Sequence, residues 1–322
     1  MISPVFQMSN AGARLRGEPV RARRRRAAST QGSALLLTLW ALMLLSAAVL
    51  AWAQLVQNDI ELSGEANRAV EARAMAHSGL AIALHPLVTQ KTPLLDEELA
   101  DGMGFAVQMS SEGARLNVRW LLEGEDPRKK NIFMHWLEQM ELTFQERETF
   151  VDCLLDYIDG DNIKRLNGLE DQGEYHPPNR PLLSVEEIEK VPNSEFLTSK
   201  PNWKEHLTIL SQGPIDLSAA PVEVLRLLPG LGEARIQELI KRRQGLDGLD
   251  FTVDDHQFKS VKEIQQALSM TDLQMRELSG LVTVRDQTMR LVSEGYSGEV
   301  VRQIQVVARK SGPNPAILAW KE

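Results

Sequence analysis

An acidic loop near the middle of the chain carries the residues whose types and spacing could do chemistry. It lies within residues 157–188, which read YIDGDNIKRLNGLEDQGEYHPPNRPLLSVEEI. Asp159 and Asp161 alternate around a glycine, and Glu170 and Asp171 follow on a stretch rich in turn residues. Carboxylate oxygens on a flexible loop without sulfur suit a hard cation, and Ca²⁺ takes ~6–8 oxygen ligands. The residue types alone leave two interpretations open, a calcium site and a solvated acidic loop.

Catalytic motifs do not accompany this loop. The histidines are scattered along the chain, and no serine or cysteine lies beside a recognisable base. Asp254, Asp255 and His256 could contact a metal, although a polar loop between helices is the simpler explanation. The only cysteine, Cys153, lies in the apolar stretch FVDCLLDYI, where we expect it to pack as a small hydrophobic side chain. We therefore expect a protein that is not an enzyme.

A second motif predicts two helices joined by a tight hairpin. Residues 215–243 read IDLSAAPVEVLRLLPGLGEARIQELIKRR and resemble a helix-hairpin-helix. In nucleic-acid-binding versions the glycine-rich turn presents backbone N–H groups to a phosphate, which gives a competing function: an exported DNA-binding or DNA-uptake protein. One copy in an acidic chain supplies few phosphate contacts, however, and basic residues also suit the end of a helix. Nucleic acid is therefore not the partner we expect.

The uncharged stretch from Ser33 to Val56 can span a membrane. As a helix it reaches ~36 Å, which exceeds the ~30 Å of a hydrocarbon core. The leader before it, residues 1–32, contains seven arginines and one acidic residue, Glu18. Because arginine-rich flanks stay on the cytoplasmic side, we expect a cytoplasmic N-terminus and everything after Val56 outside.

An ordinary secretory signal is an alternative for this segment, because Ala51-Trp52-Ala53 satisfies a small-x-small cleavage site. The apolar stretch is longer than the ~7–15 residues of such signals, and helical character continues beyond it. There, apolar and small residues recur at helical spacings, at Leu62, Ala66, Ala69, Ala76, Leu80 and Ala83. We expect one long helix, half membrane anchor and half spine of a folded domain.

The charge of the part after the leader agrees with an exported domain. It has 29 basic and 43 acidic residues, a net charge of −14. Such a surface repels nucleic acid and anionic lipid and attracts cations.

Strand patterns occur on both sides of a mostly helical block. Alternating residues predict strands over 105–109 and 114–119, and again over 281–285, 300–309 and 316–320. Residues 125–278 between them are mostly helical in pattern. Because strands from both ends would pair into one sheet, we expect an α+β fold with an inserted α-helical domain.

The N-terminus resembles that of type IV pilins and type II secretion pseudopilins. Like them, it has a basic leader ending in glycine, an apolar helix directly after it and an amphipathic continuation. The resemblance implies that a prepilin peptidase cuts after Gly32 and methylates Ser33. Most members have glutamate at the fifth position after the cut, to neutralise a neighbouring subunit's amine in lipid, and this chain has Leu37. That departure resembles minor pseudopilin K, which implies a place at the filament tip.

The resemblance continues to the end of the chain. Residues 111–117, SEGARLN, are similar to a turn of the family, and residues 306–309 and 316–320 resemble its closing strands. It implies a type IV pilin-like fold, a long N-terminal helix on an antiparallel sheet, with an all-α insert that contains the helix-hairpin-helix-like unit. The predicted domains are a removed leader (1–32), a transmembrane half-helix (33–56), the pilin-like helix and first strands (57–124), the insert (125–278) and closing strands (279–322).

The acidic loop also resembles the family, from Asp156 through the Leu-Glu-Asp triplet to Pro-Pro-Asn-Arg-Pro-Leu. Since pseudopilin K binds calcium in its helical domain, the resemblance implies Ca²⁺ with Asp159, Asp161, Glu170 and Asp171 as candidate ligands. It further implies a single-pass inner-membrane protein with a periplasmic domain. Its implied partners are the minor pseudopilins I and J and the major pseudopilin. The rival functions are the exported DNA-binding protein and a minor tip pilin of a type IV pilus.

Overall fold

The chain forms two compact units, residues up to Leu62 and residues from Ser63 onward. The computed structural model describes residues 31–248, 252 and 254–322, so residues 1–30 of the predicted leader lie outside the described part. Helix α1 (Gln31–Leu84) supplies the described part of the first unit and begins the second.

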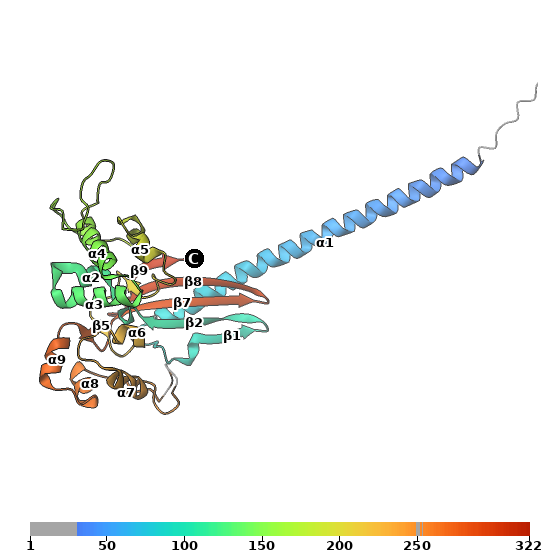
Figure 1. The fold of residues 1–322 in the computed structure, drawn as a ribbon. Helices are drawn as coiled ribbons and strands as arrows, with labels where there is room; N and C mark the ends of the chain where they lie inside the picture. Colours follow the sequence, from blue (N-terminus) through green and yellow to red (C-terminus); the bar gives the residue numbers. More distant parts are fainter. Residues whose placement is uncertain (1–30, 249–251, 253) are drawn as a thin grey trace, which may run out of the picture. The chain divides into compact units, whose positions relative to one another are not determined.

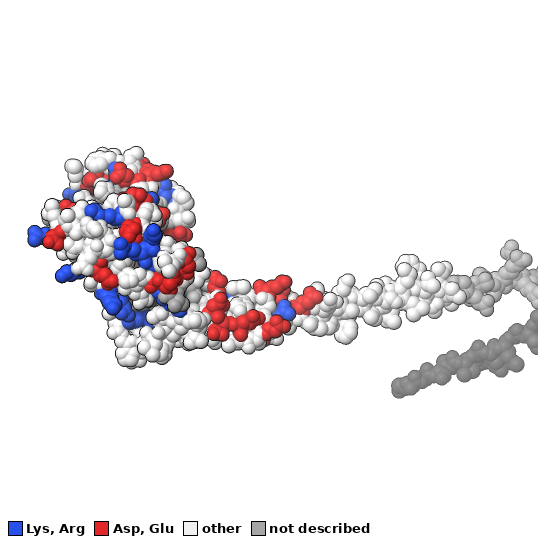
Figure 2. Space-filling view, turned by 90° about the horizontal axis from the view of Figure 1, so that it is seen from below, with Lys and Arg blue, Asp and Glu red and all other residues white. Residues whose placement is uncertain are grey.

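The N-terminal half of α1 carries no charged side chain from Gln31 to Asn58. In Figure 2 this stretch is uniformly white, and red and blue side chains appear only further along the helix. Within the described part of the chain, α1 is the one helix long and apolar enough to cross a membrane, judged by length and composition. The finding agrees with the predicted span over residues 33–56.

A five-stranded antiparallel sheet forms the base of the second unit (Figure 1). Its order is β1-β2-β7-β8-β9, and every neighbouring pair is antiparallel. The strands are β1 (Asp96–Ala100), β2 (Met103–Ser111), β7 (Thr288–Ser297), β8 (Val300–Arg309) and β9 (Ala316–Lys321). Because β2 pairs with β7 along its whole length, strands from both sides of the helical block share one sheet, which confirms the predicted α+β arrangement.

Small residues let α1 lie close to the sheet. Ala72, Ala76 and Leu80 are buried against it. Ser293 Oγ donates to the Ala76 carbonyl at 2.7 Å. A Cβ on Gly295 would lie 2.0 Å from the Ala72 carbonyl oxygen, so only glycine permits this helix–sheet distance.

The central strand β7 was missed in the sequence, and the close helix explains why. Its inward positions near α1 are Leu291, Ser293, Gly295 and Ser297, all buried. Strand prediction relies on alternating large apolar side chains, and a strand that must accommodate a helix backbone at short distance carries small and hydroxyl side chains instead.

The strand predicted over residues 114–119 is reduced to two residues and does not join the main sheet. The chain leaves the sheet in a 3-10 turn, η2 (Glu112–Ala114). It then forms only two strand residues, β3 (Leu116–Asn117), which pair in parallel with β4 (Leu207–Thr208) and not with the main sheet. The Asn117 side chain accepts from Trp120 N at 3.1 Å and so begins helix α2 (Val118–Leu122), a local cap that overrides the alternating pattern.

Residues between β2 and β7 form the insert, whose core is separate from that between α1 and the sheet. This core includes residues from Leu116 to Val282 and so extends beyond the predicted limits 125–278 at both ends. Cys153 is fully buried in it.

The predicted strand 281–285 is reduced to β6 (Val282–Thr283), which pairs in parallel with β5 (Ile215–Asp216). Figure 1 shows the insert helices gathered at one end of the sheet. After α2 they are α3 (Pro127–Gln139), α4 (Phe144–Ile158), α5 (Glu195–Thr198), α6 (Val222–Leu225), α7 (Glu233–Arg243), α8 (Val261–Ala267) and α9 (Asp272–Leu278), with 3-10 turns η3 (Glu123–Glu125) and η4 (Val185–Lys190).

Candidate functional site

Helix α4 places two acidic side chains on one face. The helix begins at a capping box between Thr143 and Glu146. Asp156 and Asp159 lie three residues apart, close to one helical turn, so their side chains share a face. Asp156 is fully buried, and Asp159 is partly exposed at the C-terminal end of the helix. A buried carboxylate requires partners, so this face must be covered by polar or charged groups.

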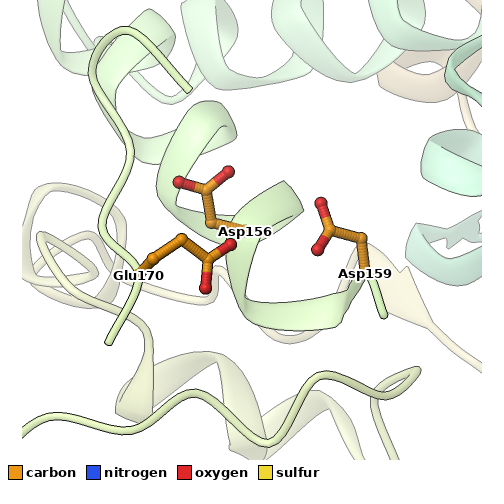
Figure 3. A group of neighbouring side chains, drawn as sticks. All are labelled: Asp156, Asp159 and Glu170. Atoms are coloured by element: carbon orange, nitrogen blue, oxygen red, sulfur yellow. The ribbon is translucent and has the colours of Figure 1, made fainter. Parts of the chain in front are cut away.

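The loop after α4 brings a third carboxylate to this face. Gly168 lies against Asp156, where an added Cβ would be 1.9 Å from the carboxylate, so the close approach requires glycine. Two residues further, Glu170 is 6% exposed. Oxygens of Asp156, Asp159 and Glu170 lie within 4.8 Å of one another. Figure 3 shows these three side chains, the acidic cluster, on the end of α4 and on the following loop.

The guanidinium of Arg165 provides positive charge beside the acidic cluster. Its Nη1 donates to Asp156 Oδ1 at 2.7 Å and to Asp159 Oδ2 at 2.5 Å. Its Nη2 donates to Glu125 Oε1 at 2.7 Å. The backbone N–H of Arg165 also donates to Asp156 Oδ2 at 3.2 Å. Arg165 thus neutralises two carboxylates of the cluster but is not bonded to the third.

Glu170 is the carboxylate that the described structure leaves without a partner. Neither of its oxygens accepts a hydrogen bond from any described residue, although both are buried. Burial raises the pKa of Glu170 above its ordinary value, and the charges of Asp156, Asp159 and Asp161 raise it further. A buried carboxylate with no donor costs free energy, which a bound cation would recover.

The donor set of the acidic cluster fits calcium. It consists of carboxylate oxygens, with no sulfur or imidazole among the three residues. Ca²⁺ prefers oxygen ligands in irregular arrangements, whereas zinc prefers nitrogen and sulfur. Asp156, Asp159 and Glu170 would hold the ion, which would supply the positive charge that Glu170 lacks. Such an ion would hold the loop on α4.

Two of the four predicted ligands are not in the cluster. Asp159 and Glu170 belong to it, whereas Asp161 and Asp171 are exposed. The Asp161 carboxylate accepts from Ile163 N at 2.8 Å in its own turn, and Asp171 Oδ1 lies 2.7 Å from His176 Nδ1. The side chains of consecutive loop residues point to different sides, so the Asp171 side chain is exposed while that of Glu170 is buried.

Asp156 is the member of the acidic cluster that the sequence prediction did not include. The prediction concentrated on the loop and treated the end of α4 only as apolar core. The spacing Asp156–Asp159 was a usable signal, because two acids three residues apart on a buried helix share a face.

The predicted group Asp254, Asp255 and His256 is not brought together. His256 Nε2 lies 2.7 Å from Glu263 Oε1, away from the two aspartates. Asp254 joins Asp247 and Asp255 in a mostly exposed acidic group. A hydrogen bond from Leu246 N, with others from the same loop, lowers the pKa of Asp254 to about 2. These internal donors explain the group without a ligand.

The predicted hairpin contains the short helix α6 and the longer helix α7. Gly230 adopts φ 71° in the turn between them, a conformation that favours glycine. Arg242 Nε donates to Glu238 at 2.6 Å, and Arg243 Nη1 donates to the Ala220 carbonyl at 2.8 Å. Two basic side chains at the end of α7 are thus used in contacts within the insert. The helix-hairpin-helix assignment stays a prediction.

The predicted processing residues, Gly32 and Ser33, and the residue predicted to set tip placement, Leu37, lie at the start of α1. Gly32, Ser33 and Leu37 are all within the helix, and the Leu37 side chain is 70% exposed in the uncharged half. Cleavage after Gly32 and methylation of Ser33 stay predictions.

Comparisons with known proteins agree with this fold. A family model described as "Type II secretion system (T2SS), protein K" matches residues 114–196, the segment that begins the insert and contains the acidic cluster. No curated protein matches the chain. Among solved structures, the chain is similar to one from the crystal structure of the GspK-GspI-GspJ complex of the enterotoxigenic Escherichia coli type 2 secretion system. The two share 15% identity and a TM-score of 0.56, over 83% of this chain and 98% of that chain.

That structural likeness supports the fold, and the family match lies on the part of the fold that interrupts the sheet. The matched region begins at the last residue of η2, contains β3, α2, α3 and α4 with the loop that follows it, and ends in α5. The family match on residues 114–196, the shared fold and the long apolar N-terminal helix all agree with the resemblance of the sequence to minor pseudopilin K of type II secretion.

Proposed function

We propose that the chain caps the tip of a periplasmic pseudopilus. The position of the insert carries this proposal. Helix α1 meets the sheet where Ser297 Oγ donates to Glu71 at 2.7 Å, and it ends where Lys310 Nζ donates to the Ala83 carbonyl at 2.8 Å. The chain leaves the sheet for the insert after Ser111 and returns to it at Thr288. Both residues lie at the end of the sheet where α1 reaches Ala83. A body at that end of the sheet would obstruct a subunit stacked above it.

The partners in this proposal are the minor pseudopilins I and J and the major pseudopilin. The similar crystal structure is of a complex of GspK with GspI and GspJ, which supports such an assembly for a chain of the same fold. The role of the chain in secretion would be structural rather than catalytic.

The proposed orientation places the N-terminus in the cytoplasm and the sheet and insert in the periplasm. The arginines of the leader support it, because basic flanks are retained on the cytoplasmic side of a single inner-membrane helix. A prepilin peptidase would then remove the leader on that side.

Processing is expected to leave Ser33 as the mature N-terminus, with a methylated amine. The reason is the junction at Gly32, where the basic leader meets the apolar helix. Intact mass spectrometry and N-terminal sequencing of the membrane-extracted protein measure both features. A mature protein that begins at Gln54, after Ala51-Trp52-Ala53, would instead identify an ordinary secretory signal.

Leu37 is expected to restrict the chain to one filament end. A carboxylate at this position could pair with a neighbouring subunit's amine inside the membrane, and leucine cannot. In immunogold micrographs of assembled pseudopili, wild-type protein should label one end, and Leu37→Glu should also label the shaft. Substitution of the neighbouring Leu36 by glutamate controls for the added charge. Wild-type label along the shaft would refute capping.

Calcium is the proposed ligand of the acidic cluster. The buried, unpartnered carboxylate of Glu170 supports a cation beside Asp156 and Asp159, and the oxygen donor set supports calcium over softer metals. In this proposal the ion holds the loop after α4 in place and so stiffens the insert that caps the filament.

A further inference from the structure

Arg165 occupies the side of the acidic cluster that a cation would also need. Its Nη1 lies 2.7 Å from Asp156 Oδ1 and 2.5 Å from Asp159 Oδ2, so Arg165 forms an ion pair with each of these two carboxylates of the cluster. A guanidinium and a divalent cation both seek the lone pairs of these two carboxylates. Each is positive, so close approach of one raises the free energy of the other.

The surroundings give Arg165 a place to move. Its side chain is 22% exposed, and together with Asp159 it lines a surface pocket of about 440 Å³. The pocket lining includes the apolar side chains of Leu122 and Ile158, which can pack against the aliphatic part of an arginine side chain. A displaced guanidinium would therefore remain against the protein while its charged end reaches water.

Glu125 provides an alternative partner outside the cluster. Its Oε1 accepts from Arg165 Nη2 at 2.7 Å, and its side chain is 55% exposed in η3 on the wall of the same pocket. Arg165 can keep this ion pair when it releases Asp156 and Asp159. In this movement Arg165 exchanges its contacts with Asp156 and Asp159 for contacts with water and keeps its ion pair with Glu125.

We propose that Arg165 is a built-in competitor for the cation and sets the affinity of the acidic cluster for calcium. Without calcium its guanidinium neutralises Asp156 and Asp159; calcium displaces it toward Glu125 and the pocket. This inference rests on the proposed calcium site. Its consequence is that the insert stays folded without the ion, while the ion binds more weakly than three carboxylates alone would bind it.

Calcium titration calorimetry on the detergent-solubilised full chain tests the exchange. Arg165→Gln should lower the Kd for calcium by about tenfold, within the ~5–150-fold range of coupled binding equilibria. In chelator the same variant should melt at a lower temperature than wild type, because Asp156 loses its counter-charge. Arg226→Gln, which removes an exposed ion pair with Glu233 in the same insert, controls for net charge and should change neither quantity appreciably.

A second variant keeps the test decisive if Arg165→Gln folds poorly. Arg165→Lys keeps a positive charge beside Asp156 and Asp159 but replaces the planar fork by a single ammonium group, so it should lower the Kd for calcium by less than Arg165→Gln does. If calcium binds wild type and Arg165→Gln equally, or binds the variant more weakly, the exchange is overturned and the calcium site stands. If calcium binds no variant, both the site and the exchange fail.

Discussion

Replacement of Arg290 by methionine is expected to lower the free energy of unfolding by about 3–5 kcal/mol, because it strands a buried charge. Glu112 is fully buried in the turn where the chain leaves the sheet. Arg290 on β7 bonds it through two nitrogens, at 2.9 and 3.0 Å. Thr208 of β4 donates to it at 2.5 Å. The carboxylate therefore connects the sheet to the insert.

Urea unfolding of the detergent-solubilised chain, followed by tryptophan fluorescence, measures this loss. Arg226→Met is the matched control: it breaks an exposed pair with Glu233 and should cost at most about 1 kcal/mol. A loss of that small size for Arg290→Met would show that the buried pair does not hold the insert on the sheet.

The same pair predicts an acid dependence. Burial opposes ionisation of Glu112, but the hydrogen bonds and charge of Arg290, with the Thr208 hydroxyl, lower its pKa below the ordinary 4.5. A lowered pKa in the folded state contributes stability above the unfolded value, and this stability is lost as pH falls through the folded pKa. The stability difference between wild type and Glu112→Gln should therefore shrink below pH 4.5.

Calcium is expected to raise the free energy of unfolding of the chain by binding at the acidic cluster. An ion at a hundred times its Kd adds ~2.7 kcal/mol to the free energy of unfolding. Thermal unfolding should occur at a higher temperature in millimolar calcium than in chelator. Asp156→Asn with Glu170→Gln should remove the difference, whereas Asp161→Asn with Asp171→Asn should retain it, because those exposed carboxylates lie outside the cluster.

Two further outcomes sharpen this experiment. Magnesium should stabilise less, since it demands short octahedral bonds and dehydrates reluctantly. In chelator, Glu170→Gln alone should not destabilise, because burial and neighbouring charges already raise the pKa of Glu170 and disfavour its ionised form. If the variant with Asp161→Asn and Asp171→Asn is no longer stabilised by calcium, the ion binds at these exposed loop carboxylates and not at the acidic cluster.

The sequence predicted helices and strands correctly where a local residue pattern determines them. The uncharged run from Ser33 to Val56 predicts its helix because length and apolarity are properties of the segment itself, and α1 includes it. Strand β8 (Val300–Arg309) was predicted with its observed bounds, since half of its residues are valine or isoleucine, which favour strands. The same reasoning failed at β7, where packing against α1 requires Ser293 and Gly295 in place of large apolar side chains.

By itself the sequence determined that the chain has an apolar anchor, an α+β body interrupted by helices, and an acidic loop suited to a hard cation. Those features follow from composition, period and residue type. Only the tertiary structure decided which carboxylates meet, because Asp156, Glu170 and Arg165 come together through the return of a loop onto α4 and not through spacing. It likewise decided that Glu112 and Arg290, 178 residues apart, form one buried pair, since burial is a property of the folded chain alone.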